Sequence, residues 1–268
     1  MVKNILKRII AFSAFFLALS LLHAEEDGQY YERLVIPLCK ATVTESGKEE
    51  DHEVHTYSGF TLCYRESYEE AEWVAYVLTD KETEAVTGRS EDFRSDPNIS
   101  TLSASPADYR KSGFDRGHLA PAADMEWSER STSESFLMSN MTPQSPSFNR
   151  GMWKKLEDAV RYFAKEYGKV LVVTGPVLEK PSSDYTFIGE DKVTVPEYFY
   201  KVLLSKKEDG SYIAAAFIMP NRKCEGTIYD YEVTVDEVER RTGLDFFSGL
   251  DDSIEDFIEG SIDSKDWQ

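Results

Sequence analysis

Six segments rich in β-branched and aromatic residues predict the strands of a central antiparallel sheet. They span residues 35–38, 55–64, 71–78, 169–174, 198–204 and 212–219. Acidic stretches separate the early segments, as expected of turns at a protein surface. Because neither an internal repeat nor a second domain boundary interrupts the pattern, the sequence predicts one domain built on this sheet.

A helix is predicted to begin near Asn149 and to end before Gly168, a typical C-terminal stop. Its apolar residues recur at spacings of 3, 4, 3 and 4 and therefore share one helix face: Trp153, Leu156, Val160, Phe163 and Tyr167. A second helix is predicted over 236–241, and the acidic C-terminal tail 251–268 is expected to be partly ordered at best. The pattern as a whole indicates an α+β fold with a central antiparallel sheet flanked by helices.

The N-terminal 24 residues have the outline of a signal peptide. Three basic residues precede an apolar run of 14 residues over 9–22, which is shorter than the roughly 18 needed to span a bilayer, and Ala24 is a small residue suited to cleavage. We therefore expect an exported protein, periplasmic or secreted, without stable membrane association after cleavage. An uncleaved membrane anchor is the alternative. The domain itself is expected over 25–250.

The chain has three cysteines, Cys39, Cys63 and Cys224. Export would permit one disulfide at most, and Cys39 and Cys63 are candidates if they lie on adjacent strands. Three small buried apolar side chains are an equally good interpretation. No Cys/His spacing typical of a structural zinc site occurs.

The formal net charge of −19 argues against a protein that binds nucleic acid with its whole surface. The charge is unevenly distributed. Residues 105–165 carry nine Lys or Arg and eight Asp or Glu, whereas residues 225–268 carry three basic and fourteen acidic residues. Any nucleic-acid binding around 105–165 should therefore be loose and salt-sensitive.

The strongest chemical signal surrounds His118. It lies within the stretch 112–121, in which Gly113 and Gly117 permit tight backbone turns and Asp115 and Arg116 bring opposite charges beside the imidazole. The segment Ser139-Asn-Met-Thr-Pro-Gln144 and then Asn149-Arg-Gly-Met-Trp-Lys-Lys-Leu-Glu157 follow.

These three segments, in this order and at this spacing, resemble the DNA/RNA non-specific endonuclease family, which includes the Serratia-type secreted nucleases and endonuclease G. The resemblance runs from about residue 57 to about residue 247. It implies a ββα-metal (His-Me finger) active-site motif, DNA and RNA as substrates, and the capacity to form a homodimer.

His118 is the general base that this resemblance implies. A neutral imidazole, with an ordinary pKa near ~6.5, accepts a proton from water at neutral pH. The alternative is a histidine–carboxylate pair that packs a turn.

The resemblance gives Asn149 the role of ligand to Mg²⁺, or to another divalent cation such as Mn²⁺, which prefers oxygen donors and keeps several waters. Capping of the helix is the alternative role for Asn149. Glu157 lies eight residues further on, about 12 Å along a regular α-helix, so it is expected to hold a metal-bound water. A surface ion pair with Lys154 or Arg161 is the competing interpretation.

Further residues receive roles by resemblance. Asn140 is expected to orient the histidine or the phosphate, although a turn-forming side chain is also plausible. Arg116 is expected beside the phosphate, with a structural salt bridge as the alternative. An arginine that stabilises the transition state is expected at Arg89, with Arg94 as second choice. The residues expected to contact substrate phosphates, although surface cations are more often only solvated, are Arg150, Lys154, Lys111 and Lys155.

The sequence thus predicts an exported, metal-dependent endonuclease that cleaves DNA and RNA without sequence specificity. Two alternatives stay open. One is a metal-dependent phosphodiesterase that acts on non-polymeric substrates, which the acidic surface favours. The other is a catalytically inactive, exported nucleic-acid-binding protein.

Overall fold

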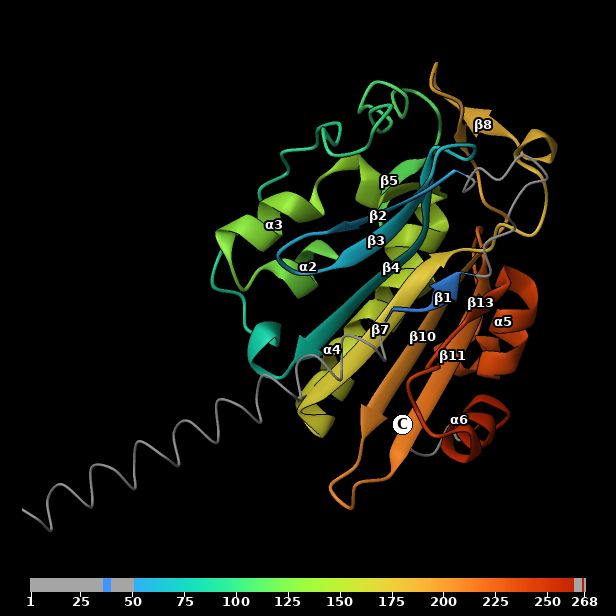
Figure 1. The fold of residues 1–268 in the computed structure, drawn as a ribbon. Coiled ribbons are helices and arrows are strands. Elements are labelled where there is room, and N and C mark those ends of the chain that lie inside the picture. Colours follow the sequence, from blue (N-terminus) through green and yellow to red (C-terminus); the bar gives the residue numbers. More distant parts are fainter. Residues whose placement is uncertain (1–35, 40–50, 263–266, 268) are drawn as a thin grey trace, which may run out of the picture.

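The protein is described by a computed structural model that covers residues 36–39, 51–262 and 267. Its centre is a seven-stranded antiparallel sheet with the strand order β12-β11-β10-β7-β4-β3-β2 (Figure 1). The strands are β2 His52–Thr56, β3 Thr61–Arg65, β4 Glu70–Thr79, β7 Lys169–Pro176, β10 Tyr198–Lys206, β11 Tyr212–Pro220 and β12 Glu232–Val233. The predicted α+β class with a central antiparallel sheet is confirmed.

The middle strands are buried on both faces, which explains why they appear in the sequence as continuous apolar runs. In β10, Phe199 and Leu203 point into one core, while Tyr200, Val202 and Leu204 point into the other. Side chains alternate between the two faces of a strand, so an unbroken apolar run fits a sheet that is covered on both sides.

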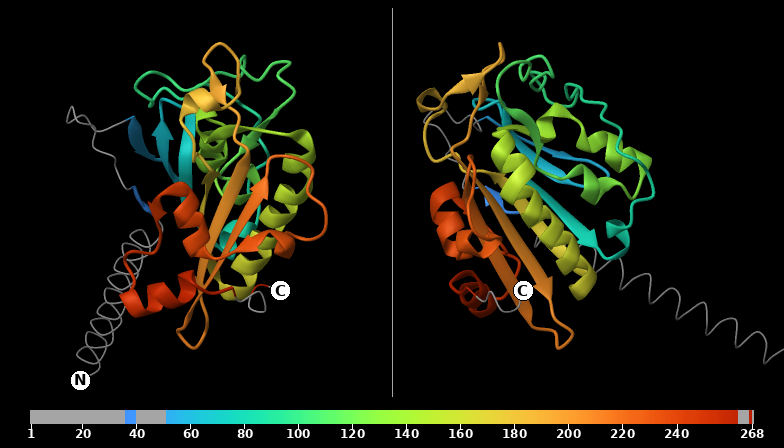
Figure 2. Two further views of the ribbon diagram at one scale, coloured as in Figure 1. Left: turned by 90° about the vertical axis from the view of Figure 1, so that its right-hand side faces the viewer. Right: turned by 180° about the vertical axis from the view of Figure 1, so that it is seen from behind.

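Helices cover both faces of the central sheet. Helix α4 (Lys154–Tyr167) packs along one face, and α5 (Val235–Thr242) and α6 (Asp252–Glu259) lie on the opposite face (Figure 2). Two short helices, α2 (Ala122–Met125) and α3 (Glu129–Ser135), lie on the α4 side. No helix among the described residues has the length and apolar character needed to cross a membrane.

Three two-stranded sheets complete the fold. They pair β1 (Leu38–Cys39) with β13 (Leu244–Asp245), β5 (Asp115–His118) with β6 (Met141–Gln144), and β8 (Phe187–Ile188) with β9 (Val193–Thr194). Short helical turns connect these elements: η1 Lys81–Thr83, η2 Met138–Asn140, the π-helical η3 Phe148–Trp153, η4 Ser182–Asp184 and η5 Ile228–Tyr231.

Four elements differ from the prediction. The segment 35–38 does not supply a strand of the central sheet, because the strand at this place is β1, Leu38–Cys39, which pairs with β13 in a separate sheet. The segment 55–64 is not one strand but parts of β2 and β3, joined by a turn over 57–60. The α-helix starts at Lys154 instead of Asn149, because the preceding turn is π-helical and non-helical at Gly151. The tail contains α6, and Trp267 is fully buried against Phe163 with its indole nitrogen bonded to the carbonyl oxygen of Ala214.

Two other predictions concern residues that are only partly covered. The expected signal peptide 1–24 lies outside the described residues. Cys63 is a buried thiol, and its Sγ lies 3.6 Å from His52 Nδ1. The side chain of Cys39 lies outside the described part.

Candidate active site

The β5–β6 hairpin presents His118 at the end of β5, opposite Met141. The hairpin is tightly packed at Gly117, where an added Cβ would lie 2.2 Å from Gln144 Cδ. Because a larger residue would force the strand away from Gln144, glycine is required here for the close approach. The hairpin therefore fixes the position of the histidine through its backbone.

The imidazole of His118 packs against two aromatic side chains. Its ring centroid is 4.9 Å from that of Phe136 and 5.7 Å from that of Phe93. Its Nε2 is shielded from solvent and has no hydrogen-bond partner among the described residues. Burial, reinforced by the positive charges of Arg89 and Arg116, lowers the pKa of His118 to about 3. The ring is therefore neutral at physiological pH, the form that accepts a proton.

Arg116 and Arg89 flank this histidine. The guanidinium carbon of Arg116 lies 3.9 Å from the centroid of Phe93, and that of Arg89 lies 5.2 Å from the centroid of Phe136. Both side chains are exposed. They thus place two positive charges on the solvent-facing side of the aromatic residues around His118, where an anion can reach them.

Arg94 has a different environment. Its guanidinium donates to the carboxylate of Asp92 at 2.8 Å, and to the carbonyl and hydroxyl oxygens of Ser133 at 3.0 and 3.1 Å. These bonds tie the 92–94 segment to α3. Of the two arginines considered for the transition state, the structure brings Arg89 to the histidine and uses Arg94 to hold a loop.

Asn149 is oriented by Asp115, the first residue of β5. Asn149 Nδ2 donates to Asp115 Oδ2 at 3.0 Å, and Arg150 donates to both oxygens of the same carboxylate at 2.8 and 2.6 Å. Burial opposes ionisation of Asp115, but these hydrogen bonds outweigh it and hold its pKa below the usual range. Asn149 Oδ1 accepts no hydrogen bond from the residues that the structure describes. Asn149 does not cap α4, whose N-cap is Trp153.

Glu157 lies in the first turn of α4 above a buried group of charges. Burial raises its pKa to about 7, while the nearby Lys201 and Arg161 favour the ionised form. Lys201 is fully buried, with its Nζ 4.8 Å from the Trp153 ring centroid. Arg161 donates to the buried carboxylate of Asp124 at 2.6 Å. Glu157 is therefore a half-buried carboxylate that is partly protonated near neutral pH. It does not form the surface ion pair that the sequence offered as an alternative.

Asn140 is fully buried, and its amide bonds to the backbone. Its Oδ1 accepts from the Ala120 N–H at 2.9 Å, and its Nδ2 donates to the carbonyls of Ala120 and Ser135 at 3.0 and 2.8 Å. These bonds hold the chain directly after His118. Because both functional atoms of Asn140 are already engaged, the geometry fits orientation of the histidine loop better than orientation of the phosphate.

The remaining predicted substrate contacts lie on the surface. Arg150 is engaged with Asp115, as described above, and Lys154 forms an ion pair with Asp158 at 2.7 Å. Lys111 and Lys155 are exposed. Arg150 and Lys154 thus already have carboxylate partners, and contact of these four cations with substrate phosphates stays a prediction.

The donor set at Asn149 fits a hard divalent cation. An amide oxygen fixed by a hydrogen bond through its own nitrogen is a suitable ligand, and a carboxylate such as Glu157, in the first turn of the helix that follows, is of the type that accepts hydrogen bonds from the waters that such an ion retains. The buried, unpartnered Nε2 of His118, on the same strand as Asp115, suits a water that is to be deprotonated. The residues present thus fit the cation that the sequence predicts.

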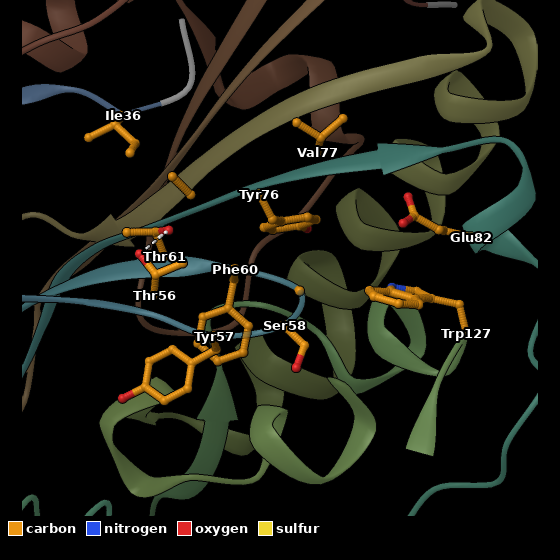
Figure 3. Close-up of a pocket in the computed structure, with 12 residues that line it drawn as sticks. Ile36, Thr56, Tyr57, Ser58, Phe60, Thr61, Tyr76, Val77, Glu82 and Trp127 are labelled. Carbon is orange, nitrogen blue, oxygen red and sulfur yellow. Dashed lines mark hydrogen bonds between the residues drawn. The ribbon is translucent and has the colours of Figure 1, made fainter. Parts of the chain in front are cut away.

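A separate pocket of about 300 Å³ lies away from these residues. Figure 3 shows its walls: Tyr57 and Phe60 from the β2–β3 turn, Tyr76 and Val77 from β4, and Trp127 from the loop before α3. None of the predicted site residues lines it. The pocket therefore does not indicate the position of the predicted active site.

Asp115 has a different partner from the one that the sequence predicts. It was expected beside the imidazole, whereas its carboxylate holds Asn149 and Arg150. The signal was available, because residues three apart on a strand face opposite sides, whereas residues two apart, such as Arg116 and His118, share one. The aromatic walls Phe93 and Phe136 were also missed, and no local motif marks them.

A two-stranded hairpin that carries a histidine, followed by a helix whose entry carries an oriented asparagine, defines a nuclease-like site of the ββα-metal class. The sequence profile of the DNA/RNA non-specific endonucleases matches residues 40–253. The chain belongs to this family.

Known relatives agree with this membership. The chain is 35% identical over 207 residues to zebrafish (Danio rerio) mitochondrial nuclease EXOG, with 72% of this chain and 60% of that protein covered. It is 35% identical over 202 residues to human (Homo sapiens) mitochondrial endonuclease G, covering 71% and 68%. Nuclease C1 of Cunninghamella echinulata var. echinulata is 36% identical over 205 residues, covering 72% and 81%.

The fold is also found in a solved structure. The crystal structure of the EndoG/EndoGI complex, described as showing the mechanism of EndoG inhibition, matches with a TM-score of 0.71 and 32% identity. The match covers 79% of this chain and 92% of that chain.

The prediction of export is contradicted by these relatives. Zebrafish EXOG and the endonuclease G proteins of human and cattle (Bos taurus) are mitochondrial nucleases, a location that differs from the predicted export. The error has a physical basis. A segment with basic residues, many apolar residues and no acidic ones is shared by secretory and organelle-targeting sequences, so its composition alone does not separate the two.

Proposed function

We propose that this protein is a magnesium- or manganese-dependent endonuclease that hydrolyses phosphodiester bonds in DNA and RNA without sequence specificity. His118 acts as general base and Asn149 as metal ligand. The observation that carries the proposal is the neutral imidazole with a buried, unpartnered Nε2, held on the same strand as the carboxylate that orients Asn149. A nuclease domain over 25–250 and a homodimer stay predictions.

In this mechanism His118 removes a proton from a water molecule as that water attacks the phosphorus atom. Arg89 and Arg116 offset the negative charge that develops on the phosphate oxygens. Asp115 holds Asn149 through the amide nitrogen, so Asn149 Oδ1 would be the ligand of the cation, and Glu157 would help to hold the cation through water. The divalent cation, when bound, supplies Lewis-acid stabilisation of the phosphate and of the leaving oxygen.

The direct test is digestion of plasmid DNA and total RNA by the purified chain with magnesium and with EDTA. His118→Ala should lower kcat by about 10²- to 10⁴-fold, the loss expected for a general base, with substrate affinity retained. His55→Ala, which removes a histidine on β2, is the matched control and should keep full activity. Near-normal turnover in His118→Ala would refute the assignment.

The same assay separates the alternatives. Degradation of polymers that requires metal excludes an inactive binding protein. Intact polymers together with hydrolysis of a small bis-aryl phosphate would instead identify a phosphodiesterase.

A further inference from the structure

A second group of metal-ligating side chains lies at the edge of the central sheet. His52 on β2, Cys63 on β3 and Glu72 on β4 come from three neighbouring strands (Figure 1). One potential ligand atom from each residue lies within 4.8 Å of the other two. None of the three belongs to the residues assigned to the nuclease reaction.

A β-bulge brings the third residue into the group. Cys63 pairs with Trp73 and Tyr64 pairs with Ala71, so Glu72 is the extra residue on β4. In a regular strand Glu72 and Trp73 would face opposite sides, but a bulge re-aims a side chain. Here the bulge places the Glu72 carboxylate beside His52, with Nδ1 and Oε1 2.9 Å apart.

The distances fit a small tetrahedral ion. The Cys63 Sγ to His52 Nδ1 distance is 3.6 Å. Zinc–sulfur and zinc–nitrogen bonds of ~2.3 and ~2.0–2.1 Å at a tetrahedral angle place the two ligand atoms about 3.5 Å apart. The second carboxylate oxygen, Glu72 Oε2, lies 3.6 Å from Arg65, so the carboxylate can bind an ion through Oε1 and keep its arginine.

The burial also suits such a site. Cys63 is fully buried and the Glu72 side chain is 10% exposed, whereas that of His52 is 22% exposed. The inner ligands are thereby shielded, and solvent can supply a fourth ligand beside His52. A thiolate, an imidazole and a carboxylate together favour a borderline-soft ion over the hard cations that bind oxygen alone.

We propose that His52, Cys63 and Glu72 form a site for a divalent transition-metal ion of the zinc type, which ties the edge strand β2 to β3 and β4. Binding releases the Cys63 thiol proton, because the thiolate is the ligand. The site differs in chemistry from the oxygen-donor site at Asn149, so magnesium in excess does not displace its ion.

Cobalt(II) tests the site, since thiolate ligation gives an absorption band that oxygen and nitrogen ligands do not. The full chain carrying Cys39→Ser and Cys224→Ser retains Cys63 as its sole thiol. Titration in excess magnesium should saturate the thiolate band at one cobalt per chain, and zinc should abolish it. Absence of the band from the folded protein would overturn the proposal.

Ligand variants in the same background complete the test without altering the buried thiol. His52→Gln and Glu72→Gln should weaken cobalt binding by at least about 10-fold, while His55→Gln, on the same strand, should bind as the parent does. Circular dichroism verifies that each variant is folded. Parent-like binding by His52→Gln, or equal loss in His55→Gln, would refute the assignment. Because the readout is spectroscopic, it is independent of nuclease activity.

Discussion

The low pKa of His118 contributes to a loss of protein stability in mildly acidic solution. A single substitution at this position should remove that contribution. In the folded protein burial and two arginines favour the neutral ring, whereas in the unfolded chain the ring takes up a proton near its ordinary pKa of about 6.5. The unfolded state therefore binds more protons in mildly acidic solution. Stability is full above about pH 6.5 and is lost progressively as the pH falls toward about 3.

The magnitude follows from the two pKa values. With a folded pKa of about 3 and an unfolded pKa of 6.5, His118 destabilises the protein at pH 5 by about 2 kcal/mol relative to pH 7.5. His118→Leu removes this titration. Its altered packing against Phe136 changes stability by an amount that does not depend on the ionisation of residue 118.

The measurement is denaturant unfolding of both proteins in EDTA at pH 7.5 and at pH 5. The wild type should lose about 2 kcal/mol more than His118→Leu between the two pH values, since the other titrating groups are common to both proteins. Equal losses in wild type and His118→Leu would refute a buried, neutral histidine.

Three further substitutions test separate parts of the structure. Asp115→Asn should move the magnesium titration of cleavage rate to about 10- to 100-fold higher concentration, because Asn149 loses its orienting carboxylate; an unchanged titration contradicts that role. Glu157, with a pKa of about 7, should cause kcat/KM to fall as the pH drops through 7, and Glu157→Gln should remove this limb from the pH profile. Trp267→Ala should lower the free energy of unfolding by about 3–5 kcal/mol, measured with urea, because the indole is fully buried; a change below ~1 kcal/mol would mean that the C-terminal segment does not pack on the sheet.

The elements predicted well are those whose pattern follows directly from burial. Strands β7, β10 and β11 are covered on both faces, and α4 buries a single stripe that includes Leu156 and Val160, so their apolar residues follow simple periods. The β2–β3 turn was missed because Gly59 lies within an aromatic run that resembles one strand. An added Cβ at Gly59 would meet Met125 Sδ at 2.5 Å, a contact with a residue distant in sequence.

The residues of the candidate site also divide into those that the sequence predicts and those that it does not. The motif segments single out His118, Asn149 and Glu157 as candidates, because catalytic residue types at fixed spacings carry their own signal. Lys201 carries no such signal, because it is one polar residue in an apolar strand. The Glu157 carboxylate that interacts with its ammonium group comes from the helix packed above it. Contacts of this kind depend on how α4 packs across the sheet, which local sequence does not specify.

The distribution of charge reconciles an acidic protein with the proposed nucleic-acid substrate. Around the site, Arg150 is paired with Asp115, Lys154 with Asp158 and Arg94 with Asp92. Arg89 and Arg116 instead lie over aromatic rings beside the histidine, and the exposed Arg89–Glu91 contact of 3.3 Å opposes phosphate binding weakly. Attraction for phosphate is therefore concentrated where the bond would be cut. An acidic surface around such a site favours release of cleaved strands, which suits an enzyme that degrades nucleic acid over one that must remain bound to a chosen sequence.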